Sequence, residues 1–97
     1  MSKRGELKPV DADEENIRNN AKYYTVVGFH PGQGRKLYQT FDNLVWAKAY
    51  CKELIHNKSL RLRAVMIYAV DEYDRNALVG TMNLDELWKD VEIKRYA

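Results

Sequence analysis

The sequence is poor in residues that build covalent or metal-bound frameworks. Cys51 is its single cysteine, so the chain cannot form an internal disulfide or a cysteine-based zinc site. A reducing compartment is the simplest expectation for such a chain. Serine is also scarce, because only Ser2 and Ser59 are present, and a Ser-His-Asp catalytic set is therefore unattractive.

Long apolar runs are missing as well. The most apolar stretch, Ala64–Val70, is far too short to span a bilayer, so we expect no membrane association. No apolar run follows the charged residues at the start of the sequence, and no secretory signal is expected. These absences together predict a soluble, cytoplasmic protein.

The 97 residues suffice for one domain. Residues 1–21 hold few large apolar groups, and we expect them to form a flexible or partner-ordered arm, with a short helix possible between Asp11 and Asn20. Residues 22–97 are expected to form a single α+β domain. An apolar fraction of 45% is enough for one core.

Two hairpins are predicted on either side of a helix. Tyr23–Phe29 and Lys36–Phe41 are rich in β-branched and aromatic residues, and the Pro-Gly loop between them favours a turn. In the second strand Leu37, Gln39 and Phe41 alternate with Lys36, Tyr38 and Thr40, which predicts that Leu37 and Phe41 share a face. The later strands are expected over Leu62–Val70 and Ala77–Met82.

A central amphipathic helix is predicted over Asn43–Asn57. Asp42 or Asn43 is suited to cap it, and Asn57 is suited to end it in a left-handed conformation. Its apolar stripe consists of Leu44, Ala47, Cys51, Leu54 and Ile55. The apolar run Ala64–Val70 is continuous rather than alternating, which predicts a central strand covered on both faces.

A second helix is predicted at the C-terminal end. Asn83-Leu84-Asp85-Glu86 resembles a capping box, and apolar residues follow at helical spacing. The predicted fold is therefore β-β-α-β-β-α, with a four-stranded antiparallel sheet packed by the central and C-terminal helices. In outline, a core of this size is similar to one that recurs among small phage-encoded inhibitors and accessory proteins, although no residue motif carries that similarity to a named family.

The C-terminal stripe is the first candidate for function. Tryptophan is over-represented at the centres of protein interfaces, so Trp88 is a candidate anchor for a protein partner. The alternative is that this helix packs onto its own sheet. Trp46 lies away from the core stripe of the central helix, where partial exposure is expected. The candidate partner-binding residues are Trp88, Leu84, Leu87, Val91 and Trp46.

A basic central segment suggests a second function. Residues 35–63 carry seven basic and two acidic groups, a net charge of +5, whereas residues 64–97 carry a net charge of −3. Tyr23, Tyr24 and Tyr38 offer rings on which bases can stack. The candidate residues for single-stranded nucleic-acid binding are Arg35, Lys36, Lys48, Lys52, Arg61 and Arg63. The alternative is an ordinary solvated surface.

Catalytic signals are weaker. The glycines of the loop His30–Lys36 have neither of the two phosphate-binding spacings, and Asp71–Asn76 lacks the glycine of a calcium loop. His30 and His56 leave open a small histidine-dependent nuclease, but Cys51 lies on the apolar stripe, where an inert thiol is expected. We therefore predict a non-catalytic regulatory protein without metal or cofactor, an inhibitor, adaptor or assembly factor that binds a protein. A homodimer through a sheet edge is an alternative mode of association.

Overall fold

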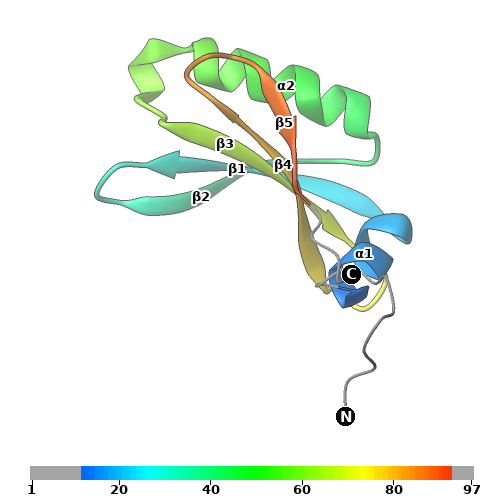
Figure 1. Cartoon of the computed structure of the whole chain (residues 1–97). Helices are drawn as coiled ribbons and strands as arrows, with labels where there is room; N and C mark the ends of the chain where they lie inside the picture. The colour runs from blue at the N-terminus through cyan, green and yellow to red at the C-terminus, as the bar shows by residue number, and fades with distance from the viewer. Residues whose placement is uncertain (1–11, 93–97) are drawn as a thin grey trace.

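A computed structural model describes residues 12–92 of the chain, and its architecture is α+β. Five strands form one antiparallel sheet, and two α-helices accompany it (Figure 1). The elements, in chain order, are α1 (Ala12–Asn19), β1 (Tyr23–His30), β2 (Gly34–Phe41), α2 (Leu44–His56), the short 3-10 helix η1 (Lys58–Leu60), β3 (Ala64–Val70), β4 (Asn76–Asn83) and β5 (Trp88–Asp90).

The strand order is β2-β1-β3-β4-β5, and every neighbouring pair is antiparallel. The predicted α+β class, the antiparallel sheet and the four long strands are confirmed. The prediction of four strands was one short, because β5 adds a fifth at the β4 edge. The strand β3 lies in the middle of the sheet, where the most apolar segment of the sequence was expected to lie.

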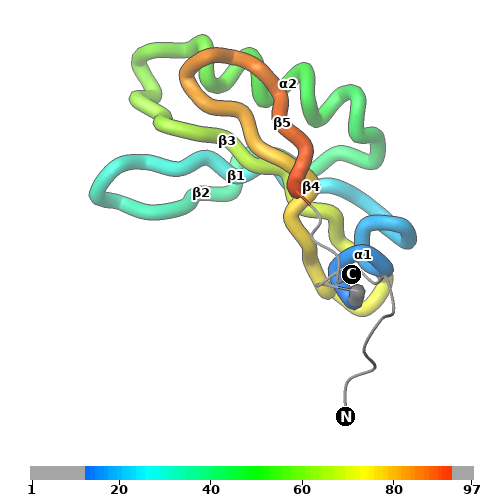
Figure 2. The backbone as a smooth tube through the Cα atoms, in the orientation of Figure 1, coloured from blue at the N-terminus to red at the C-terminus, as the bar shows by residue number. Residues whose placement is uncertain are grey.

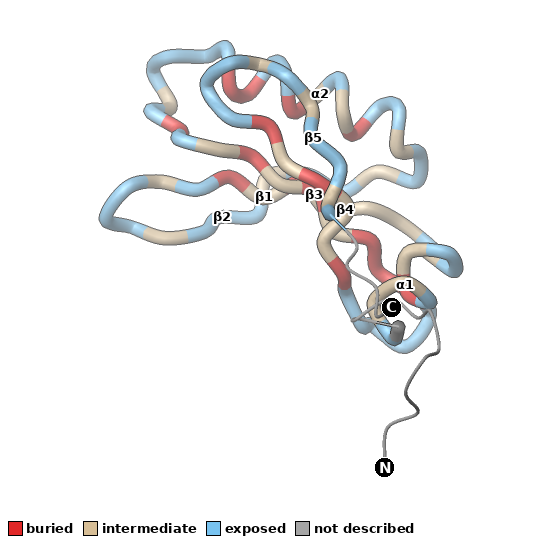
Figure 3. Tube along the Cα trace, viewed as in Figure 1, coloured by how far each residue is buried: buried red, intermediate tan, exposed pale blue. Residues whose placement is uncertain are grey.

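The helix α2 lies across one face of the sheet and supplies four of the nine buried residues of the core cluster. Its N-cap is Asn43, whose Oδ1 accepts hydrogen bonds from the backbone N–H groups of Val45 and Trp46. The predicted apolar stripe is buried at Ala47, Cys51, Leu54 and Ile55. These side chains pack on Val26, Val65, Ile67 and Met82 from three strands, and Figure 3 shows buried segments both on α2 and on the strands of the sheet.

The end of α2 differs from the prediction. Asn57 has an extended backbone, with φ −79° and ψ 97°, and its side chain instead accepts a hydrogen bond from the backbone N–H of Ser59. The left-handed residue is Arg61, which ends η1 with φ 56°. Asparagine is favourable both as the N-cap of a following helix and as the left-handed residue that ends a helix, so the sequence alone does not distinguish these two roles of Asn57.

The predicted C-terminal helix is absent from the described residues. Leu84 to Leu87 form a loop in which Glu86 has φ 60°, and Asp85 Oδ1 accepts a hydrogen bond from the backbone N–H of Leu87. The chain then pairs with β4, with Met82 opposite Trp88. An asparagine, an aspartate and a glutamate suit a turn as well as a capping box, and strand pairing decides between them.

The alternation predicted for the second strand is also wrong. A bulge in β2 lies opposite the step from Val26 to Val27, because Val26 pairs with Gln39 and Val27 pairs with Leu37. Leu37 therefore points to the face opposite α2, whereas the ring of Phe41 lies 5.2 Å from that of Tyr50 on α2. The bulge separates two residues that strict alternation would place together.

The helix α1 packs at the other end of the sheet, beside the turn between β3 and β4 (Figure 2). Ile17 is buried there, and the guanidinium Nη1 of Arg18 donates a 2.8 Å hydrogen bond to the carbonyl oxygen of Leu78. A short helix in the segment from Asp11 to Asn20 is thus present. The first eleven residues of the expected arm lie outside the described residues.

Candidate functional site

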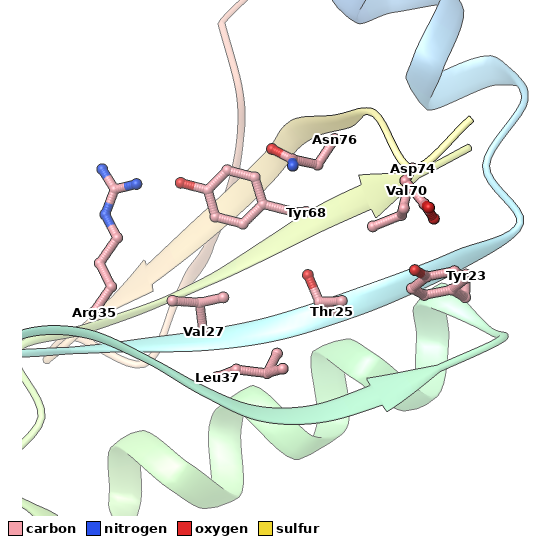
Figure 4. A pocket seen from close by; sticks show the side chains of 9 residues that line it. All are labelled: Tyr23, Thr25, Val27, Arg35, Leu37, Tyr68, Val70, Asp74 and Asn76. Atoms are coloured by element: carbon pink, nitrogen blue, oxygen red, sulfur yellow. The ribbon is translucent and has the colours of Figure 1, made fainter. Parts of the chain in front are cut away.

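The face of the sheet opposite α2 carries apolar side chains from three neighbouring strands. Side chains alternate along a strand, so every second residue of β1 and β3 points away from the helix. Figure 4 shows these side chains on the side of the sheet away from α2. The surface, called here the open face, is defined by Tyr23, Thr25, Val27, Phe29, Arg35, Leu37, Met66, Tyr68 and Val70.

The open face corrects a prediction about β3. Burial alternates from Ala64 to Ala69, since Val65, Ile67 and Ala69 are fully buried while Met66 and Tyr68 are only partly so, and Val70 at the end of the strand is buried although it belongs to the open face. The continuous apolar run Ala64–Val70 predicts a strand that is covered on both faces. The structure shows instead that one face carries the core and the other carries partly exposed apolar side chains.

Two large apolar side chains of this face are exposed to solvent. Leu37 is 60% exposed and Phe29 is 38% exposed, although both belong to regular strands. An antiparallel sheet that faces water ordinarily presents polar side chains on that side. A contiguous apolar patch of this kind is the common mark of an interaction surface.

A shallow hollow runs along the open face, with a volume of about 500 Å³. Tyr23, Val27, Leu37 and Tyr68 are among the residues that line it. Its two ends are charged differently, because Arg35 lies at one end and Asp74 with Asn76 at the other (Figure 4). The hollow therefore offers apolar contact along its length and opposite charges at its ends.

The turn between β3 and β4 holds Asp74 at its end of the hollow. The buried Asp71 organises this turn: its Oδ1 accepts hydrogen bonds from the backbone N–H groups of Tyr73 and Arg75, and its Oδ2 accepts from the Arg75 guanidinium at 2.9 Å. Burial alone raises the pKa of Asp71, but the hydrogen bonds and charge of Arg75 outweigh it, and the pKa lies below its usual value. Arg75 is thereby committed to Asp71, and Asp74 has no ion-pair partner among the described residues.

Trp88 is placed against the body of the protein. Its indole packs on Gly80, where a β-carbon would collide with the ring, and it contacts the core cluster beneath α2. The indole N–H donates a hydrogen bond to Asp90, and the ammonium of Lys48 lies 5.0 Å from the ring centroid. Trp88 is half-buried. This position fits a side chain that packs on its own sheet better than one that is exposed to anchor a partner.

The other sequence-predicted partner residues do not form one helical stripe. Leu84 and Leu87 lie in the β4–β5 loop and are each 63% exposed, while Val91 follows β5 and donates its N–H to Val79. Trp46 lies on the first turn of α2 and is 66% exposed, as the sequence led us to expect. These side chains come from separate elements instead of one C-terminal helix.

The basic candidates are divided between the two sides of the sheet. Arg35 belongs to the open face, whereas Lys48 and Lys52 lie on α2. Lys36 is next to Arg35 on β2 and covers the ring of Tyr38 at 5.3 Å. Arg61 and Arg63 lie just before β3, and the N–H of Arg63 bonds to the carbonyl of Phe29. The six residues therefore do not share one surface.

The two histidines contact different partners. The Nε2 of His30 lies 2.6 Å from the hydroxyl of Tyr38, whose pKa is raised by burial and by the nearby Tyr50. The Nδ1 of His56 lies 2.9 Å from a carboxylate oxygen of Glu86, and this contact holds the pKa of Glu86 below its usual value, helped by Lys52 and Lys58. Each ring thus has a local structural contact of its own.

Cys51 is fully buried beneath α2, and burial raises the pKa of its thiol to about 12. A thiol in this state is a poor nucleophile. Across residues 12–92 no three histidine, cysteine or acidic side chains are grouped in a way that would hold a metal ion.

Sequence reasoning missed the open face as a site. The sequence places Tyr23, Val27, Leu37 and Tyr68 only within predicted strands, and of these it offers Tyr23 alone as a ring on which a base can stack. One signal was present: five of the eight residues of β1 are apolar or aromatic, which is more than a strand with a single covered face needs. The position of Leu37 depends on the bulge, for which the sequence gives no sign.

Comparison with known proteins adds no constraint, because no family model, curated protein or solved structure matches the chain. Neither α1 nor α2 has the length and apolar character that a bilayer-crossing helix requires. The site is therefore argued from its own residues.

Proposed function

We propose that this chain is a small non-catalytic protein-binding protein, an inhibitor, adaptor or assembly factor, whose binding surface is the open face. The observation that supports this most is the exposure of Leu37 beside Phe29 and Val27 on a face that no described helix covers. Each fully buried side chain of this size contributes roughly 1.5–3 kcal/mol. A partner that buries several of these side chains therefore gains several times this binding free energy.

The charges of the hollow favour a protein over a nucleic acid. A nucleic-acid surface has to neutralise a series of phosphates, and its affinity depends on several cations in one groove. The lining of the hollow contains one cation, Arg35, and one anion, Asp74. Mixed charges around an apolar centre are the usual composition of a protein interface.

One observation keeps single-stranded nucleic acid as the second candidate. Tyr23, Phe29 and Tyr68 place aromatic rings on the two neighbouring strands β1 and β3, and bases stack on such rings in sheet-based binding modules. The alternative predicts binding of a labelled single-stranded oligonucleotide at low salt that weakens steeply as salt rises. Absence of oligonucleotide binding at low salt would rule out this second candidate.

A histidine-dependent nuclease is disfavoured, because the ring of each histidine already contacts another side chain, Tyr38 for His30 and Glu86 for His56.

Photo-crosslinking tests the proposal. A photoreactive amino acid replaces Leu37 in the full chain, and the matched control carries it at Val45, an exposed residue of α2. In cells that make the protein, we expect discrete protein adducts from position 37 and none from position 45. Nucleic-acid adducts from position 37 would support the second candidate. A chain without adducts at position 37 would overturn the proposal.

A further inference from the structure

We infer that the partner of the open face is a second copy of this chain, packed face to face about a two-fold axis. The inference rests on the proposed function and names the protein that the surface binds. Its starting point is the distribution of charge on the face. Arg35 and Asp74 lie at opposite ends of the hollow, and neither side chain has an ion-pair partner among the described residues (Figure 4).

The register of the sheet fixes how far apart these charges are. Arg35 pairs with Phe29 at one end of β1, and Asp74 follows Val70, which pairs with Tyr23 at the other end. Six residues of β1 separate Phe29 from Tyr23, so the two charges are about 20 Å apart along the strand direction. They are also offset across the sheet, because Arg35 lies on β2 and Asp74 in the β3–β4 turn. One apolar face thus has a cation at one end and an anion at the other.

This arrangement is complementary to itself. Because Arg35 lies on β2 and Asp74 in the β3–β4 turn, the line that joins them runs diagonally across the sheet. A two-fold axis that lies between two such faces and crosses this line at right angles near its midpoint exchanges the two ends of the line between the copies. The Arg35 end of each copy then faces the Asp74 end of the other, and two equivalent ion pairs form. An axis along that line would instead leave Arg35 facing Arg35, which like-charge repulsion disfavours.

The open face is large enough to form a specific dimer interface. The strands β1, β2 and β4 have eight residues each, which corresponds to a length of about 26 Å. Four neighbouring strands give a width of about 19 Å. The projected area is then about 500 Å² for each copy and about 1,000 Å² for the pair, which reaches the lower limit of a specific interface.

A dimer through a sheet edge is the competing arrangement. The edge strand β5 has only three residues, and the edge strand β2 contains the bulge beside Tyr38. Short edges and bulges both oppose pairing with another strand. The face offers the larger apolar surface, so we assign the contact to the face.

Light scattering coupled to size exclusion, together with sedimentation equilibrium, tests the assignment on the full chain. We expect a dimer in the wild type and a monomer with unchanged circular dichroism in Leu37→Glu. Val45→Glu, on α2, is the matched control and should stay dimeric. Arg35→Glu and Asp74→Arg should each weaken the dimer by about tenfold or more, and the double variant should recover most of that loss.

The possible outcomes distinguish failure of the dimer from failure of the proposed protein-binding function. A wild type that stays monomeric to about 200 μM, well above the dissociation constants of specific dimers, would overturn the dimer. Protein adducts at position 37 would then still support the proposed function, and their absence would remove both. A dimer that is indifferent to Leu37→Glu and to both charge reversals would overturn the face-to-face contact and point to the sheet edge.

Discussion

The indole of Trp88 packs directly on Gly80, in the space that a side chain would occupy on any other residue. The contact joins the short edge strand β5 to β4, and Lys48 of α2 covers the outer surface of the ring. A tryptophan that the sequence marks as a candidate anchor thus holds the sheet edge against the helix. The second tryptophan, Trp46, is far more exposed.

The two tryptophans give a matched prediction. Trp88→Ala should lower the free energy of unfolding by about 2–3 kcal/mol, because it empties a half-buried site that contacts the core. Trp46→Ala should change it by no more than about 0.5 kcal/mol, as is usual for exposed positions. Urea denaturation followed by circular dichroism measures both. Equal stability of the two variants would contradict the packing role of Trp88.

The turn at Asp71 predicts a specific response to acid. Its folded-state pKa lies below the unfolded value, so the carboxylate stabilises the fold above about pH 4 and this contribution is lost as the pH falls through the folded pKa. In Asp71→Asn an amide nitrogen replaces one carboxylate oxygen, and this nitrogen cannot accept the hydrogen bond that the guanidinium of Arg75 donates. It should be less stable at neutral pH, and its stability should depend less on pH below about pH 4.

Thermal melts between neutral and acidic pH check this expectation. Glu72→Gln is the control, because Glu72 is an exposed neighbour in the same turn. It should melt like the wild type at neutral pH. If Asp71→Asn retained the full acid sensitivity of the wild type, the lowered pKa of Asp71 would not be a source of that sensitivity.

Local patterns predicted the elements whose stability is local. The cap at Asn43 and the stripe from Ala47 to Ile55 specify α2, and β-branched and aromatic residues specify the long strands. The segment after Asn83 was mistaken for a helix because its local signals fit both a helix start and a turn. Pairing of Trp88 with Met82 decides the outcome, and that contact depends on β4.

The open face could not be predicted for a related reason. Which residues of a strand face the solvent depends on the bulges in its partners, and the bulge in β2 moves Leu37 away from Phe41. Whether a helix covers both faces depends on how many helices exist. Losing the expected C-terminal helix left one face without a covering helix among residues 12–92.

Hydroxyl-radical footprinting measures most directly which surface the protein uses. Oxidation rates of single side chains report solvent access, and they can be compared between the protein in an extract of the cells that make it and the purified, dilute chain. We predict that Leu37, Phe29 and Tyr68 become protected in the extract while Trp46 and Val45 do not. Protection of Trp46, Leu84 and Leu87 with unchanged oxidation of Leu37 would contradict the assignment of binding to the open face.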